Sequence, residues 1–139
     1  MAKYNRFHDV PAWQEATRLY NRTLELLETR DFTLTPTLRG HLERSALAVS
    51  NSIAVGFEQP NVEDLLPCLA AARTATIEVR SIIAGLKARP KLSPFLGRMD
   101  ELSNLAESCN RQVYAWSSAV ERSSRGGKTV SEQRAARAE

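Results

Sequence analysis

Histidine, cysteine and glycine are scarce in this chain, and their positions exclude several classes of protein. The two histidines, His8 and His41, lie far apart, and neither falls in the Glu-x-x-His pattern of di-iron helical bundles. The two cysteines, Cys68 and Cys109, fall within apolar helical patterns, so we expect buried reduced thiols and no disulfide. The six glycines form neither a P-loop nor a dinucleotide-binding pattern. We therefore expect no metal, no cofactor and no enzyme activity.

Long hydrophobic runs are also missing. The longest stretch without a charged residue, 45–57, is shorter than the ~20 apolar residues of a membrane span and contains three serines. The first ten residues include Lys3, Arg6 and Asp9 and lack the apolar core of a signal peptide. With 139 residues, of which 42% are hydrophobic and 25% charged, the composition fits one compact cytoplasmic domain.

Apolar residues instead recur at intervals of three and four, which is the pattern of amphipathic helices. The first helix is predicted at 10–30, where the carboxylate of Asp9 can accept hydrogen bonds from the first turn. The second is predicted at 36–57, after Thr35 as the capping residue. Gly56 and Pro60 are predicted to end that helix.

Two further helices complete the predicted fold. The third is expected at 62–88, because Pro67 is tolerated only near the start of a helix. The fourth is expected at 94–123, after Ser93 as a cap, and the polar residues 124–139 are expected to form a flexible tail. Short connections force neighbouring helices to run in opposite directions, so residues 1–123 are predicted to form an all-α, antiparallel, up-and-down four-helix bundle.

The third helix carries more apolar surface than one bundle axis can bury. Its main seam runs from Leu65 to Leu86, and a second seam faces about 100° away from it. We predict that the second seam is an oligomer interface, and its members are Cys68, Ala71, Ala75, Glu78 and Ile82. Glu78 is the one charge in this seam and needs a partner, for which Arg44, Arg80 or a bound ligand are the alternatives.

Seven cations are candidates for binding a nucleic acid or a protein partner. Arg73, Arg80 and Lys87 recur every seven residues on the third helix and therefore share one stripe of its surface. The first and second helices extend the set with Arg18, Arg22, Arg39 and Arg44. Such a surface would hold phosphates without reading bases. The alternative is an ordinary solvated face, since glutamates are interspersed among these cations.

Two segments resemble a known family. Residues 7–16, Phe-His-Asp-Val-Pro-Ala-Trp-Gln-Glu-Ala, resemble the opening F-x-D-L-x-V-W-Q-x-A of the four-helix-bundle proteins encoded in 23S rRNA intervening sequences. Residues 45–57 resemble the family's second motif, A-x-S-I-x-x-N-I-A-E-G-F, in which Ser52 and Val55 replace Asn and Glu. The resemblance covers residues 7–88. On the third helix, the positions where the family usually has an acidic residue, Leu, Ala and Glu are occupied by Asp64, Leu69, Ala72 and Glu78.

The resemblance implies a bundle that assembles as a ring-like homopentamer. Related bundles include the accessory variability proteins of diversity-generating retroelements, which bind a reverse transcriptase and its RNA through a basic surface. On this basis we expect a non-enzymatic accessory or scaffold protein that associates with RNA or with an RNA-handling enzyme such as a reverse transcriptase. The alternative is a protein–protein interaction module with no nucleic-acid role.

Overall fold

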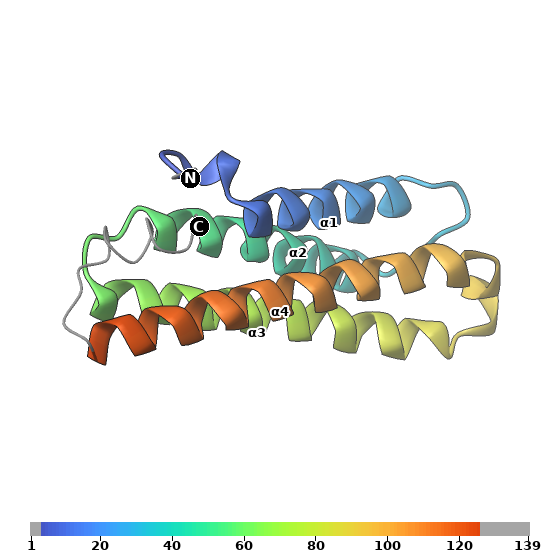
Figure 1. The fold of residues 1–139 in the computed structure, drawn as a ribbon. Helices are drawn as coiled ribbons and strands as arrows, with labels where there is room; N and C mark the ends of the chain where they lie inside the picture. Colours follow the sequence, from blue (N-terminus) through green and yellow to red (C-terminus); the bar gives the residue numbers. More distant parts are fainter. Residues whose placement is uncertain (1–3, 126–139) are drawn as a thin grey trace.

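The computed structural model describes residues 4–125, and every regular element in that range is a helix (Figure 1). The elements are the 3-10 turns η1 (Phe7–Asp9) and η2 (Pro90–Phe95) and the helices α1 (Pro11–Leu27), α2 (Pro36–Phe57), α3 (Val62–Lys87) and α4 (Leu96–Arg125). The predicted all-α class with four helices is thus confirmed for these residues. Figure 1 shows the helices lying side by side, with connections at alternating ends of the bundle.

The core lies along the axis between the four helices. α3 packs against both α2 and α4, and α1 packs against the same two neighbours. The predicted main seam of α3, from Leu65 to Leu86, is buried, and Trp116 of α4 is 4% exposed. Buried Thr23 satisfies its hydroxyl by donating to the Leu19 carbonyl oxygen of its own helix, 2.8 Å away. The apolar periodicity therefore identified the buried face of α3 and the core position of Trp116 correctly.

α1 starts one residue later and ends three residues earlier than predicted. Its N-cap residue is Val10, which offers no side-chain hydrogen bond to the first turn. Asp9 ends the η1 turn instead and forms an ion pair with Arg6, with 3.6 Å between Oδ2 and Nε. Beyond the helix the chain turns through Asp31, whose φ of 71° lies in the left-handed region that Asp tolerates better than most residues.

The two ends of α2 show one confirmed prediction and one correction. Thr35 caps the helix as predicted, since its Oγ1 accepts from the Leu38 amide at 3.2 Å. The helix ends at Phe57 as predicted, but Gly56 is not its cap, because Glu58 closes the helix with right-handed backbone. A Cβ atom on Gly56 would lie 3.0 Å from Cys68 Cβ and 3.2 Å from Leu65 Cδ1. Gly56 therefore permits the close approach of α2 to α3.

The starts of α3 and α4 follow from their prolines. α3 begins at Val62 after Asn61 as N-cap, which places Pro67 in the second turn, as its position in the sequence required. α4 begins at Leu96, two residues later than predicted, because the segment containing Ser93 first forms the η2 turn. At its other end α4 reaches Arg125, so the predicted tail boundary at 124 was two residues early. Residues 126–139 of that predicted tail lie outside the described part of the chain.

The close approach at Gly56 gives a testable difference between two glycines. We expect Gly56→Ala to destabilise the protein relative to Gly85→Ala by about 1–3 kcal/mol, the usual cost of overpacking a core contact. Gly85 is the matched control, because a Cβ there meets nothing within 4 Å and alanine is the better helix former by about 1 kcal/mol. Urea unfolding of both variants measures the difference; equal stabilities would contradict the close contact.

Candidate functional site

The predicted cations of α1 are paired with carboxylates. Arg18 Nη1 lies 2.8 Å from Glu15 Oε1, and Arg22 Nη1 lies 3.2 Å from Glu25 Oε1. Arg22 also reaches across to α4, where its Nε lies 3.7 Å from Glu101 Oε2. Exposed ion pairs of this kind contribute little stability. They do place a negative charge beside each cation, which lowers the local attraction for phosphate.

The predicted stripe on α3 is turned toward α4. Arg73 Nε donates to Asn110 Oδ1 at 3.0 Å, and the Arg73 guanidinium lies over the Tyr114 ring, 4.7 Å from its centroid. Lys87 forms an ion pair with Asp100 of α4. These two members of the stripe therefore tie α3 to α4, and any contact they make with a nucleic acid stays a prediction.

The remaining three cations differ in their surroundings. Arg39 Nη1 donates to the Leu27 carbonyl oxygen, one of the carbonyls at the end of α1 that have no partner within the helix. Within residues 4–125, neither Arg44 nor Arg80 forms an ion pair. Arg44 is exposed and Arg80 is half-buried. The seven predicted cations thus do not form one continuous free basic surface.

The predicted interface seam of α3 lies along the edge that α3 shares with α2. Ala71 and Glu78 are exposed and Cys68 and Ile82 are half-buried, so these four remain accessible in the single chain. Ala75 is only 3% exposed and packs inside the bundle, contrary to its assignment to a free surface. The seam therefore divides into one buried residue, Ala75, and four that keep part of their surface exposed.

Two shallow grooves follow this α2–α3 edge. The first has a volume of about 310 Å³ and is lined by Asn51, Ser52, Val55, Pro67, Cys68 and Ala71. The second has a volume of about 290 Å³ and is lined by His41, Arg44, Ser45, Ala48 and Glu78. We call the two together the α2–α3 groove. Part of its lining is made of small residues, which are Ser52, Cys68 and Ala71 in the first groove and Ser45 and Ala48 in the second.

Glu78 has a different partner from the cations that the sequence suggested. Its Oε1 accepts a hydrogen bond from Ser45 Oγ at 3.2 Å. Arg44 lines the same groove but lies beyond ion-pair distance of Glu78. The groove therefore presents a carboxylate and a guanidinium that are not paired with each other.

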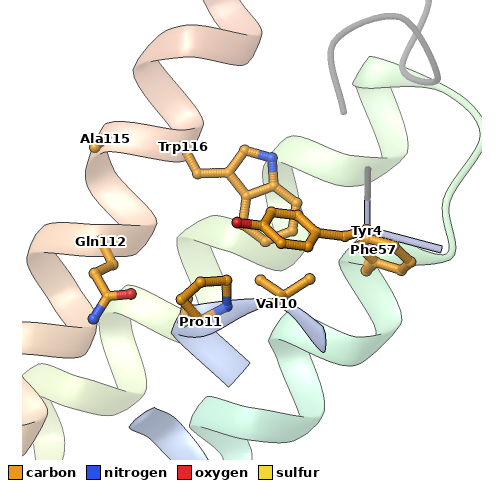
Figure 2. Close-up of a pocket in the computed structure, with 8 residues that line it drawn as sticks. Tyr4, Val10, Pro11, Phe57, Gln112, Ala115 and Trp116 are labelled. Atoms are coloured by element: carbon orange, nitrogen blue, oxygen red, sulfur yellow. The ribbon is translucent and has the colours of Figure 1, made fainter. Parts of the chain in front are cut away.

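A third cavity was not indicated by any sequence pattern. It lies where the segment before α1 meets the end of α2 and the middle of α4, and it has a volume of about 240 Å³ (Figure 2). Its walls include Tyr4, Val10, Pro11, Phe57, Gln112 and Trp116. We call it the aromatic pocket. Periodicity did not indicate it, because Tyr4 precedes the first helix and Gln112 occupies a polar position of α4.

A cluster of polar side chains between α1 and α4 borders the aromatic pocket. Glu15 Oε2 accepts from Ser108 Oγ and from Gln112 Nε2, the latter at 3.0 Å. Next to this cluster, burial raises the pKa of Cys109 from 9.0 to about 12, and the negative charge of Glu15 adds to the effect. Glu15 thus orders two side chains of α4 and adds to the burial that keeps the neighbouring thiol protonated.

The comparisons leave the family open. No protein-family model, no curated protein and no solved structure matches this chain. The similarity to 23S rRNA intervening-sequence proteins therefore stays a prediction. Within residues 4–125, no three His, Cys, Asp or Glu side chains converge as metal ligands would. None of the helices in that range has the length and apolar character needed to cross a membrane.

The raised pKa of Cys109 predicts selective protection of its thiol. In Cys68→Ser protein, which keeps Cys109 as its one thiol, iodoacetamide at pH 8 should modify the folded chain at least tenfold more slowly than the urea-unfolded chain. Only the thiolate reacts with iodoacetamide. Burial lowers the fraction of Cys109 that is thiolate and also keeps the reagent away from the sulfur. Intact-mass spectrometry follows the reaction. Equal rates in the folded and unfolded states would show that Cys109 is not buried as described.

Proposed function

We propose that this chain is a non-catalytic, self-assembling, antiparallel four-helix bundle that serves as an accessory or scaffold for an RNA-handling system. The α2–α3 groove is the observation that supports the proposal. Three of the five residues expected at an oligomer interface, Cys68, Ala71 and Glu78, line it, and it includes Val55, a large apolar side chain that is 52% exposed. A helix face that is apolar and unfilled in one chain gains stability when another surface covers it.

A ring requires a second surface that differs from the groove, because a closed ring is built from head-to-tail contacts. The opposite side of α3 supplies a candidate. There Ile77 is 52% exposed, and Tyr114 of α4 is 55% exposed. We propose that this ridge of one copy enters the α2–α3 groove of the next, where Arg44 and Glu78 are available for polar contacts.

Contact with a protein partner fits the charges of the structure better than contact with RNA. Of the seven predicted cations, Arg18, Arg22 and Lys87 already have a carboxylate partner. RNA binding through phosphates needs cations that release counterions together. We therefore place the RNA-handling enzyme, such as a reverse transcriptase, before RNA itself as the partner. Two free thiols within residues 4–125 suit a cytoplasmic location, where thiols stay reduced.

A charge placed in the groove tests the assembly. We expect the wild-type chain to sediment as a multiple of 15.5 kDa at micromolar concentration, and Val55→Arg to sediment as a monomer. The reason is that a guanidinium in an apolar contact loses hydration without gaining a partner. Analytical ultracentrifugation gives the masses, and circular dichroism checks that the variant is folded. A monomeric wild type would overturn the proposal.

Two further variants identify the second surface. Asn21→Arg adds the same charge on an exposed position of α1, away from the groove, and is expected to leave the assembly intact. Ile77→Arg is expected to dissociate it, as Val55→Arg does, because a ring buries both surfaces. Dissociation by Val55→Arg alone would instead indicate a two-fold dimer in which groove meets groove.

A salt titration separates the RNA and protein readings. Because most predicted cations are engaged, we expect the purified chain to bind structured RNA weakly, with little dependence on salt. Fluorescence anisotropy at low and physiological salt measures this. Tight binding at low salt that falls a thousandfold at physiological salt would show a phosphate surface and would place RNA first among the partners.

A further inference from the structure

The aromatic pocket has the size of a small-molecule site. Its volume of about 240 Å³ exceeds the ~150 Å³ of an engineered apolar cavity that binds benzene. Three aromatic side chains, Tyr4, Phe57 and Trp116, line it together with Val10 and Pro11 (Figure 2). Flat aromatic walls and aliphatic edges favour a flat, apolar occupant that can pack against ring faces.

The pocket contains one oriented hydrogen-bond acceptor. Gln112 Nε2 points away from the pocket, where it donates to Glu15 Oε2 at 3.0 Å and to Ser108 Oγ at 3.4 Å. Since an amide has its nitrogen and oxygen on opposite sides, this pairing directs the carbonyl Oε1 the other way. Figure 2 shows that oxygen turned toward Pro11, which also lines the pocket. Glu15 therefore acts as a positioning residue for the Gln112 acceptor.

The chemistry of the walls also excludes charged occupants. The lining residues comprise no Asp, Glu, Lys, Arg or His, and their polar side-chain groups are the Gln112 amide, the Tyr4 hydroxyl and the indole N–H of Trp116. A charged group would lose its hydration there without gaining an opposite charge. An occupant that lacks a donor would leave the Gln112 carbonyl without a partner, which also costs binding free energy.

We propose that the aromatic pocket binds a neutral, flat aromatic group that carries one N–H or O–H donor, of the indole or phenol class. The ring packs between the aromatic and aliphatic walls, and its donor bonds to Gln112 Oε1. This site is separate from the α2–α3 groove and does not depend on self-assembly. Indole and the side chain of a partner's tryptophan share this chemistry, and the experiment distinguishes them.

Titration of the full-length chain with indole, followed by NMR, tests the proposal. The side-chain amide signals of Gln112 and the indole N–H signal of Trp116 should shift and saturate at millimolar indole. 1-Methylindole, which has the same ring but no donor, should bind about threefold to tenfold more weakly, the usual effect of one hydrogen bond. No saturable shift with either compound up to the solubility limit would overturn the proposal.

Two variants locate the bound ring. Gln112→Leu removes the acceptor, so indole and 1-methylindole should then bind equally. Ala115→Phe adds a ring at an exposed lining position of α4 and should abolish binding of both. Ala84→Phe is the matched control, since it adds the same ring at an exposed position of α3 and should leave binding unchanged. Loss of binding in Ala84→Phe alone would place the site elsewhere and contradict the proposal.

A third ligand identifies the natural source of the aromatic group. N-acetyl-tryptophanamide carries the indole ring on a capped peptide unit, as a partner protein would present it. If it binds at least as tightly as indole, the pocket receives a side chain of a protein partner. If it binds more than tenfold more weakly, the enclosed pocket accepts only the free molecule. Either result supports recognition of the indole ring.

Discussion

The close approach of α2 to α3 is the contact on which the other surface features of the bundle depend. Gly56 permits it at one end, where any side chain would meet Cys68 and Leu65. Farther along, Ser45 and Ala75 are short enough to be buried between the helices. Helix axes come nearest to each other where the contact residues are small. Short side chains also leave the outer edge of the contact unfilled, and this unfilled edge is the α2–α3 groove.

Several charged and polar side chains join one helix of the bundle to another. Arg22 reaches Glu101, Arg73 reaches Asn110, and Lys87 reaches Asp100, and each of these contacts joins α4 to another helix. Cations used in this way are not gathered on one face, so the small net charge of +3 does not become a strong local field. The apolar grooves and the pocket, which need no such field, are therefore the stronger candidates for recognition.

Helical periodicity predicted the fold closely, because the apolar residues of a buried helix face recur every three or four positions, whichever helices pack against that face. It placed all four helices to within three residues and identified the buried seam of α3. It did not predict the roles of Asp9, Gly56 or Ala75, since these depend on where the adjacent segment lies in space. The partners of the cations were missed for the same reason. The side of Gln112 that faces the pocket is set by Glu15, which lies on another helix and far away in the sequence.

The last turn of α2 connects the two surfaces proposed for recognition. Its consecutive residues face three surroundings: Val55 lines the α2–α3 groove, Gly56 touches α3, and Phe57 lines the aromatic pocket. If a second copy covers Val55 and an aromatic group packs on Phe57, as proposed, both occupants would contact the same helical turn. A shift of that turn caused by one occupant would then change the affinity for the other, and thermodynamic linkage would make the effect equal in both directions. The close contact at Gly56 limits the shift, because the turn has almost no room to move toward α3.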